Sequence, residues 1–287
     1  MFARKIFVTC GAVASMAGFS VVEARAAEIL YEPFNYSNLG GPVSDNTPAN
    51  WTFGGTGAND LSVVSGNLSY SGLAPGVGNS VTNGADGLGV RRLTGTTVTS
   101  GDIYFSVLFQ LTSYGTAWTS PAAGTSVGAL TEINNTGFKV NAVVVRDTGG
   151  SGGYFFGVQK GGTGSTATFD TTLHFEGEAI LLVGRYSFDS LAADVVSLWI
   201  NPDSSTFGQA PPSPAITAVN GTDSTVGIDR FNMRQNTAAS VPEAMQWDEL
   251  RIGTTWADVT PVPEPSTWAL IGLAAATFLV QRFRSGK

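Results

Sequence analysis

The sequence predicts an all-β protein, a two-sheet antiparallel jelly-roll sandwich, with an N-terminal signal helix and a single apolar helix at the C-terminal end. Three observations predict this fold. Apolar and polar residues alternate in short runs, turn signals rich in Gly and Asn separate the runs, and no helical apolar stripe lasts three turns before residue 265. The central part of about 230 residues fits one large sandwich better than an immunoglobulin unit. Two stacked immunoglobulin-like domains are the alternative, which no internal repeat supports.

The alternation is clearest in residues 103–111 and 138–144, where every second residue is apolar. Successive side chains of a strand point to opposite faces, so each run is expected to bury one face. One short helical turn is expected at residues 255–259. The other expected strands are residues 29–34, 61–64, 67–70, 87–93, 154–160, 178–188, 195–200, 227–234 and 245–252.

The composition excludes several classes of protein. The 287 residues include one Cys, Cys10, and one His, His174, so neither a disulfide framework nor a zinc site can be assembled. The net charge of −7 argues against nucleic-acid binding, which needs a basic face. Few charged residues and 10% aromatic residues are typical of a folded domain rather than a disordered chain.

Residues 1–26 have the three parts of a secretory signal peptide. Arg4 and Lys5 form a basic start, residues 6–22 are apolar and uncharged, and residues 24–26 have the small-residue pattern of a cleavage site. An N-terminal membrane anchor is the alternative. Removal of this segment would leave a mature protein without cysteine.

The C-terminal end is expected to contain a Pro-rich linker, residues 260–267, and a transmembrane helix with a basic tail, residues 268–287. The apolar part, residues 268–280, is short for a membrane span, and we expect it to insert transiently into the inner membrane. The basic tail then lies in the cytoplasm and the main domain, residues 27–259, lies outside.

The order of residues 262–267, an apolar helix and an Arg-containing tail resembles the PEP-CTERM sorting signal. The resemblance implies that an exosortase-type membrane protease recognises a sorting motif made of Pro263, Glu264 and Pro265. It also implies export to the cell envelope, the surface or an extracellular exopolysaccharide matrix, such as that of a biofilm.

Five segments of the central part resemble the LamG-like (concanavalin A-like lectin/glucanase) sandwiches of bacterial PEP-CTERM proteins. The resemblance implies a two-sheet jelly roll in which the first and last strands pair, so that the two ends of the domain lie close together. Members of this family include carbohydrate binders, and fold alone does not decide function. The segments are residues 30–34, 181–188, 194–202, 229–231 and 247–259.

The expected domain is more acidic than the whole chain. Residues 27–260 contain nine basic and twenty acidic residues, a net charge of −11. Such a surface repels anionic polymers at low salt and is compatible with calcium. Calcium is therefore a candidate cofactor, with Asp60 and Asp194 as candidate ligands. The competing interpretation is that these loop residues satisfy the backbone of their own turns.

Four aromatic residues in loop-like segments are candidates for stacking on a sugar: Trp51, Tyr114, Trp118 and Tyr154. They stand among Gly, Ser and Thr residues and do not follow the alternation of the expected core. Packing beneath a loop is the competing interpretation.

No catalytic residue is expected. The glucanases of the resembled family carry a Glu-x-Asp-x-x-Glu arrangement on one strand, and this sequence does not contain it. Glu176 and Glu178 have suitable spacing but no third acid, whereas Asp248 and Glu249 are adjacent and would point to opposite faces of a strand. We therefore expect the protein not to be an enzyme.

The expected function is that of an exported cell-surface or matrix protein, sorted by its C-terminal signal and associated with extracellular polysaccharide. A glycoside hydrolase-like enzyme of the same fold is one alternative. A structural matrix protein without a ligand site is the other.

Overall fold

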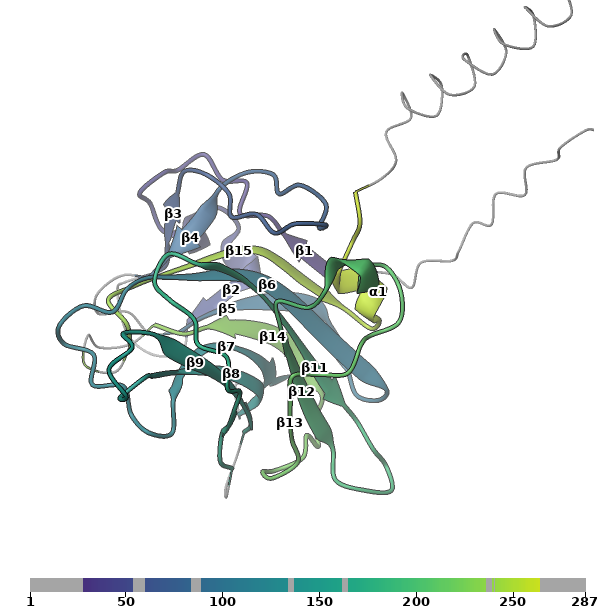
Figure 1. Cartoon of the computed structure of the whole chain (residues 1–287). Helices are drawn as coiled ribbons and strands as arrows, with labels where there is room; N and C mark the ends of the chain where they lie inside the picture. Colours follow the sequence, from purple (N-terminus) through teal and green to yellow (C-terminus); the bar gives the residue numbers. More distant parts are fainter. Residues whose placement is uncertain are drawn as a thin grey trace, which may run out of the picture.

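The structure, a computed structural model, describes residues 28–53, 60–83, 89–133, 137–161, 165–235, 239 and 241–263. These residues form two antiparallel sheets that pack face to face (Figure 1). The expected two-sheet sandwich is confirmed. Within the described residues, helix is limited to one short α-helix and a few turns of 3-10 helix.

The eight-stranded sheet contains, from edge to edge, β13 (Ile216–Ala218), β12 (Val195–Ile200), β11 (Ala179–Ser187), β6 (Asp102–Ser113), β15 (Ala244–Gly253), β4 (Ser80–Thr82) and β3 (Ser62–Val64), and β1 (Leu30–Glu32) also pairs with β15. The seven-stranded sheet contains β10 (Thr168–Phe169), β9 (Tyr154–Lys160), β8 (Phe138–Arg146), β7 (Thr125–Glu132), β14 (Ile228–Met233), β5 (Val90–Val98) and β2 (Trp51–Phe53). The helical elements are η1 (Val43–Asp45), η2 (Pro48–Asn50), η4 (Ser204–Thr206) and α1 (Trp256–Val259).

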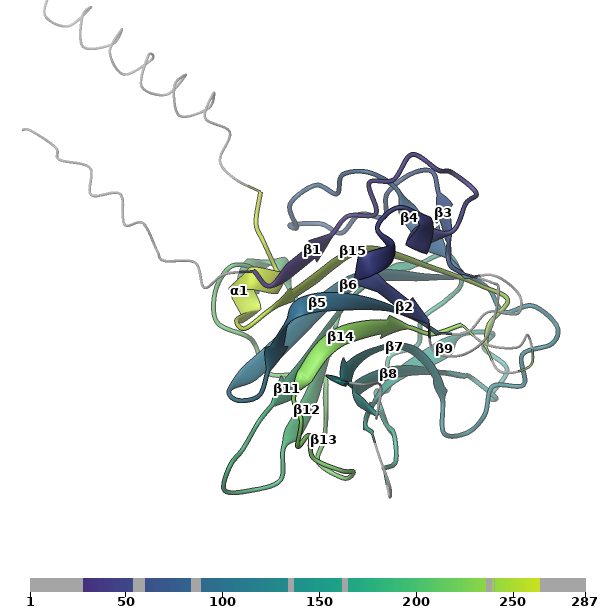
Figure 2. The same ribbon diagram turned by 180° about the vertical axis from the view of Figure 1, so that it is seen from behind.

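The first and last strands pair, as the family resemblance implied. Leu30 of β1 lies opposite Ile252 of β15, and Arg251 forms an ion pair with Glu28 at 2.8 Å. Helix α1, which follows β15, lies beside β1 when the molecule is seen from behind (Figure 2). The two ends of the described domain are therefore neighbours.

An aromatic contact joins the two sheets in the middle of the core. The ring centroids of Phe105 on β6 and Phe231 on β14 are 4.9 Å apart. Both rings need glycines beside them, because a Cβ atom on Gly184 would overlap the Phe105 ring and one on Gly128 would lie 2.8 Å from the Phe231 ring. These two glycines therefore determine how closely the sheets approach at this point.

A second apolar cluster covers the outer face of the eight-stranded sheet. Trp256 of α1 packs on Trp199 of β12 with ring centroids 5.0 Å apart. Helix α1 begins with a capping box, in which Thr255 and Asp258 exchange side-chain-to-backbone hydrogen bonds. The expected helical turn at residues 255–259 is thus confirmed. Among the described residues, no helix is long and apolar enough to cross a membrane.

The structure differs from the expected strands at residues 67–70 and at five unexpected strands, β2, β4, β7, β10 and β13, of which β7 is the longest. Residues 67–70 do not form a strand, because the backbone N–H of Leu68 donates instead to the carboxylate of Asp248 at 2.7 Å. Strand β7 was not expected, since Gly128 interrupts its alternation, yet it lies between β14 and β8 near the middle of its sheet. In both cases a contact distant in sequence decides the local structure.

Some expected features lie outside the described residues. These are the signal peptide of residues 1–26, Glu264 and Pro265 of the sorting motif, and the apolar helix and basic tail of residues 268–287. Pro263 is the last described residue.

Gly184→Ala is expected to lower the free energy of unfolding by about 1–3 kcal/mol, because the added methyl group overlaps the buried Phe105 ring. Gly137→Ala is a matched control, since among the described residues its added Cβ contacts only Glu132, at 3.6 Å. Urea denaturation of both variants measures the effect. Equal stability of wild type and Gly184→Ala would contradict the role given to Gly184.

Asp248 is a fully buried acid that fastens the segment after β3 to the sheet. Its carboxylate accepts hydrogen bonds from the backbone N–H groups of Leu68 and Glu249, at 2.7 and 2.8 Å. Burial raises the pKa of this carboxyl from 3.8 to about 8, and the two hydrogen bonds offset only part of that effect. The folded state therefore favours the protonated form.

The stabilising contribution of this group is complete below the ordinary pKa of 3.8 and is lost as the pH rises through about 8. Asp248→Asn removes the titrating group, so its free energy of unfolding is expected to fall less between about pH 5 and about pH 8 than that of wild type. Asp45→Asn makes the same chemical change at an exposed position and serves as the control for the substitution itself. Parallel curves for wild type and Asp248→Asn in urea denaturation would refute this expectation.

Candidate ligand-binding face

A row of mainly polar side chains crosses the outer face of the seven-stranded sheet, from β2 to β9. We call it the polar row. With neighbouring strands about 4.8 Å apart, six strands give the row a length of about 24 Å. Its members, each opposite the next in the strand register, are Thr52, Arg91, Asn232, Ala129, Asn141 and Gln159.

The core determines which way these side chains point. Phe231 and Met233, which flank Asn232 on β14, belong to the apolar core between the sheets. Alternation along the strand therefore directs Asn232 to the outer face. The same holds for Asn141 on β8, whose two neighbours in the strand are also core residues.

Asn232 is the exceptional member of the polar row. The residue is 1% exposed, and among the described residues neither its amide oxygen nor its amide nitrogen has a hydrogen-bond partner. The buried hydroxyl oxygen of Thr52 likewise has no hydrogen-bond partner in the described ranges. Because an unsatisfied buried polar group costs about 1–3 kcal/mol, native proteins retain few of them without a functional reason. Gly89 lies against this amide, and a Cβ there would be 2.8 Å from it.

The opposite end of the polar row is satisfied within the protein. Asn141 donates to the amide oxygen of Gln159 at 3.0 Å and accepts from the hydroxyl of Ser126. Gln159 in turn donates to the hydroxyl of Ser165 at 2.9 Å. The unpartnered atoms of the row are therefore concentrated at its β2–β5–β14 end.

Three arginines surround Asn232, and we call these four residues the arginine cluster. Arg91 lies opposite Asn232 on β5, while Arg230 and Arg234 come two residues before and after it. Burial lowers the pKa of the Arg91 guanidinium, and the positive charges of Arg230 and Arg234 lower it further. Three guanidinium groups therefore share one small region of the sheet.

Sequence reasoning missed the arginine cluster, although one signal was present. Residues 230–234 read Arg-Phe-Asn-Met-Arg, a period-two pattern that combines two core side chains with two guanidinium groups and an amide. Residues 227–234 were expected to be a strand, and the outward half of that strand carries the cluster. The net acidic charge of the domain gave no sign of a local positive region.

Two of the four aromatic candidates lie in the core. Trp51 is 3% exposed and packs between Phe34 and Arg92. Tyr154 is fully buried, and its ring packs against Phe156 with centroids 5.3 Å apart. This burial corrects the expectation for both residues, because neither presents a ring face on which a sugar could stack.

The other two aromatic candidates, Tyr114 and Trp118, line a cavity of about 100 Å³ together with Glu243. Their rings stack on each other, with centroids 5.9 Å apart and an interplanar angle of 16°. Burial raises the pKa of the Tyr114 hydroxyl to about 12. The two rings occupy each other's faces, so their role as sugar contacts stays a prediction.

The two candidate calcium ligands have partners in the protein. The carboxylate of Asp60 accepts from the backbone N–H groups of Ser44 and Leu61, at 2.7 and 2.6 Å. The carboxylate of Asp194 accepts from the Tyr186 hydroxyl and from the backbone N–H of Asp189. In the described part of the chain, no group of three or more His, Cys, Asp or Glu side chains is placed to hold a metal ion. Calcium binding stays a prediction.

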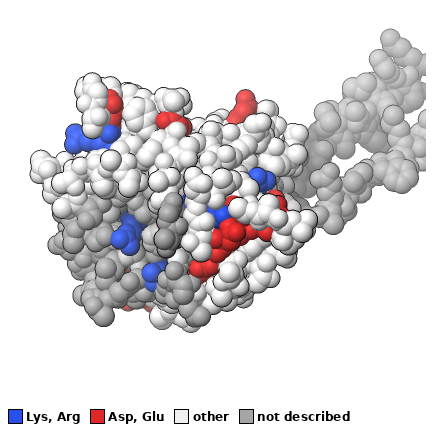
Figure 3. All heavy atoms as spheres, turned by 90° about the horizontal axis from the view of Figure 1, so that it is seen from below, with Lys and Arg blue, Asp and Glu red and all other residues white. Residues whose placement is uncertain are grey.

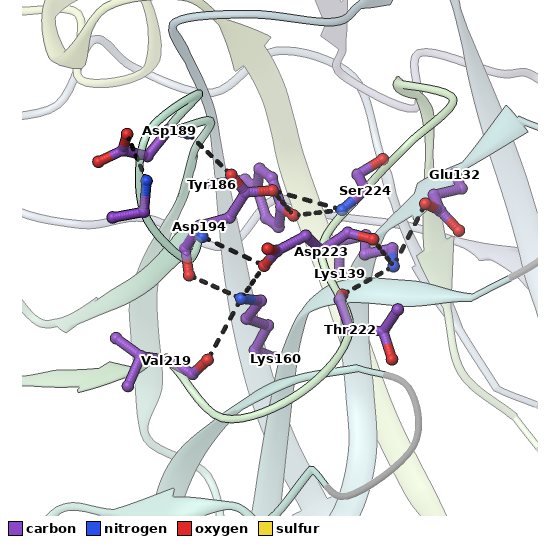
Figure 4. A network of polar contacts seen from close by, with 11 residues as sticks. Glu132, Lys139, Lys160, Tyr186, Asp189, Asp194, Val219, Thr222, Asp223 and Ser224 are labelled. Carbon is purple, nitrogen blue, oxygen red and sulfur yellow. Dashed lines mark hydrogen bonds and ion pairs between the residues drawn. The ribbon is translucent and has the colours of Figure 1, made fainter.

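A lysine ammonium group lies where loop oxygens converge beside Asp194 (Figure 4). Lys160 is fully buried, and its Nζ donates to the carbonyl oxygens of Asp194 and Val219, at 2.8 and 3.2 Å, and to the carboxylate of Asp223. Lys139 donates to the carbonyl oxygen of Asp223 at 3.2 Å. Because oxygen atoms satisfy both ammonium groups, this network holds the loop after β13 and has a structural role.

The acids considered for catalysis also have local partners. Glu176 accepts a hydrogen bond from the backbone N–H of Tyr114, and Glu178 lies 3.5 Å from Nδ1 of His174. Glu249 accepts from the backbone N–H of Val77 at 3.1 Å. These contacts connect segments of the fold and do not arrange a pair of carboxylates around a common ligand.

Residues 261–285 match the PEP-CTERM protein-sorting motif. This match confirms the resemblance observed at the C-terminal end of the sequence. The protein is therefore an exported protein with a C-terminal sorting signal.

No curated protein matches the chain. Among solved structures, the fold is similar to that of an endo-β-1,4-glucuronan lyase from the fungus Trichoderma reesei, with a TM-score of 0.51 and 9% identity over 83% of this chain and 100% of that one. The T. cruzi calreticulin globular domain has a TM-score of 0.48 and 9% identity, over 90% and 100% of the two chains. An alginate lyase has a TM-score of 0.46 and 12% identity, over 78% and 96%. At such low identity these similarities show the fold alone.

The expectation that the protein is not an enzyme is wrong. It was inferred from the fold and from the missing glucanase acids, and neither observation excludes catalysis. The glucuronan lyase has a similar sandwich, so the absence of the glucanase arrangement Glu-x-Asp-x-x-Glu does not exclude catalysis on this fold. The LamG-like assignment within the sandwich class stays a prediction.

Proposed function

We propose that this exported protein is sorted to the cell surface or an exopolysaccharide matrix, where it binds a polysaccharide along the polar row. The observation that carries the proposal is the buried amide of Asn232, which lies in a row of polar side chains and has no partner for either atom within the described part of the chain. A hydroxyl-rich ligand supplies both the donor and the acceptor that this amide lacks.

The dimensions of the polar row favour a polymer. Its length of about 24 Å exceeds that of any single sugar ring, and its side chains are amides, hydroxyls and guanidinium groups that bond to ligand oxygens. Strands rather than loops position them, and such sites are held more precisely. A chain of sugar residues lying across the strands matches this arrangement.

The proposed route to the surface gives each segment of the chain a role in export, folding or sorting. Residues 1–26 direct export, residues 27–259 form the folded domain, and residues 260–267 present the sorting motif. Residues 268–287 anchor the protein in the inner membrane until an exosortase-type protease acts. The match at residues 261–285 supports the last two assignments.

Asn232→Leu is expected to weaken polysaccharide binding about tenfold, because the amide loses its bonds to the ligand. The same change should leave the free energy of unfolding unchanged or higher, since it removes an unsatisfied buried group of similar shape. Affinity electrophoresis with a panel of neutral and acidic polysaccharides measures binding, and urea denaturation measures stability. Size-exclusion chromatography of the polymer afterwards shows whether it is also cleaved.

Asn141→Leu is the matched control in the same row. It breaks the hydrogen bonds to Gln159 and Ser126, so the free energy of unfolding should fall by about 1–3 kcal/mol. If Asn232→Leu destabilises the protein as much as Asn141→Leu does, Asn232 is a structural residue. If wild type binds no polysaccharide at millimolar concentration, the proposed function fails.

Deletion of residues 263–265 is expected to keep the protein in the membrane fraction, because the sorting protease loses its motif. Fractionation of producing cells, followed by immunoblotting of membrane, surface and medium, measures the distribution. Replacement of residues 209–211, which precede β13, by Gly-Ser-Gly is a control of equal length outside the motif. Release of the deletion variant at the wild-type level would contradict the proposed sorting step.

A further inference from the structure

The charges of the domain are distributed unevenly. Most of its basic side chains are neutralised by carboxylates, as in the ion pairs of Arg92 with Glu32 at 2.7 Å and of Lys139 with Glu132 at 3.2 Å. On the face seen from below, acidic atoms form a contiguous patch with basic atoms on either side of it (Figure 3). A net negative charge therefore does not prevent local positive regions.

Arg234 departs from this pairing. It forms no ion pair with any described residue, and its guanidinium lies 6.0 Å from the ring centroid of Phe138. Burial lowers its pKa. In contrast, Arg230 is held by Asp229 through two hydrogen bonds, of 2.6 and 2.9 Å. A half-buried positive charge without a carboxylate costs folding energy, as the unpartnered amide of Asn232 does.

Arg234 follows Asn232 by two residues, directly after the end of β14, and its charge acts on Arg91, which lies opposite Asn232. Repulsion from Arg230 and Arg234 already lowers the pKa of Arg91, so an anion placed among these groups relieves an existing cost. A guanidinium group has a planar fork of donors that matches the two oxygens of a carboxylate. The adjacent amide offers a further donor to the anion and an acceptor to a neighbouring hydroxyl.

We propose that the polysaccharide bound by the polar row is a polyuronate, and that Arg234 and Asn232 bind the carboxylate of one of its sugar residues. This inference rests on the proposed function and names the chemical class of its ligand. This inference revises the expectation that the acidic domain repels anionic polymers. The proposed binding depends on hydrogen bonds between a few side chains and one carboxylate, and not on the net charge of the domain. Arg91 adds positive potential to the same region from the opposite strand.

The test compares one polymer in two charge states. Polygalacturonate and the same polymer with its carboxylates chemically reduced to alcohols are titrated into the full-length protein by isothermal calorimetry. A panel member with sulfate groups, dextran sulfate, serves as a third probe. The expected result is at least tenfold tighter binding of the carboxylated polymer than of its reduced form and of dextran sulfate.

Arg234→Gln should reduce the affinity for the carboxylated polymer about tenfold and leave that for the reduced polymer unchanged. Arg146→Gln makes the same chemical change at an exposed arginine that lies over the Tyr114 ring, outside the polar row. It should bind both polymers as wild type does. Thermal unfolding of each variant separates loss of binding from loss of fold.

The outcomes distinguish the two proposals. Equal binding of the carboxylated and reduced polymers would overturn the polyuronate inference and leave polysaccharide binding intact. Equal or tighter binding of dextran sulfate would show that negative charge is recognised without selection for carboxylate, which also overturns the inference. Failure of all three polymers, together with the wider panel, would overturn both proposals.

Discussion

The contact between Phe105 and Phe231 is the constraint on which the rest of the structure depends. It brings a central strand of each sheet to a fixed separation, with ring centroids 4.9 Å apart, and it requires glycine on the strand beside each ring. Because Phe231 points into the core, the alternation of β14 directs the side chains of its neighbours in the strand to the outer face. Asn232 points outward, and the arginines that flank the strand extend the same face. The core thus determines the direction of the side chains of the polar row.

Two buried polar clusters in this sandwich have opposite properties. Around Lys160, carbonyl and carboxylate oxygens satisfy the ammonium group, so the cluster fastens a loop. Around Asn232, like charges gather beside an amide that has no hydrogen-bond partner among the residues that the structure describes. Both clusters cost desolvation, and the Lys160 ammonium recovers that cost within the protein, whereas the described residues offer no hydrogen bond to the Asn232 amide. A polar group that stays unsatisfied in a well-packed sheet is explained most simply by a partner outside the chain.

Local sequence predicted the strands whose faces differ clearly and missed those defined by distant contacts. Alternation located β6, β8 and β9, because every second residue there is a core residue. It missed β7, in which Gly128 stands where the Phe231 ring needs space, and it placed a strand at residues 67–70, which a carboxylate from β15 holds instead. The candidate site was missed for a similar reason. Composition sums the charges of the chain, whereas the arginine cluster exists only when β5 and β14 pair.

The outer faces of the two sheets differ in a way that connects sorting with binding. The outer face of the eight-stranded sheet is apolar and needs the cover of α1, where the hydroxyl of Ser106 donates to the carbonyl of Val259 at 2.6 Å. Ala74 then donates to the carbonyl of Pro261 at 2.9 Å, so this same side holds the chain as it approaches the sorting motif. The polar row lies on the outer face of the other sheet. The proposed attachment through the C-terminal segment and the proposed ligand-binding row therefore lie on opposite outer faces of the sandwich.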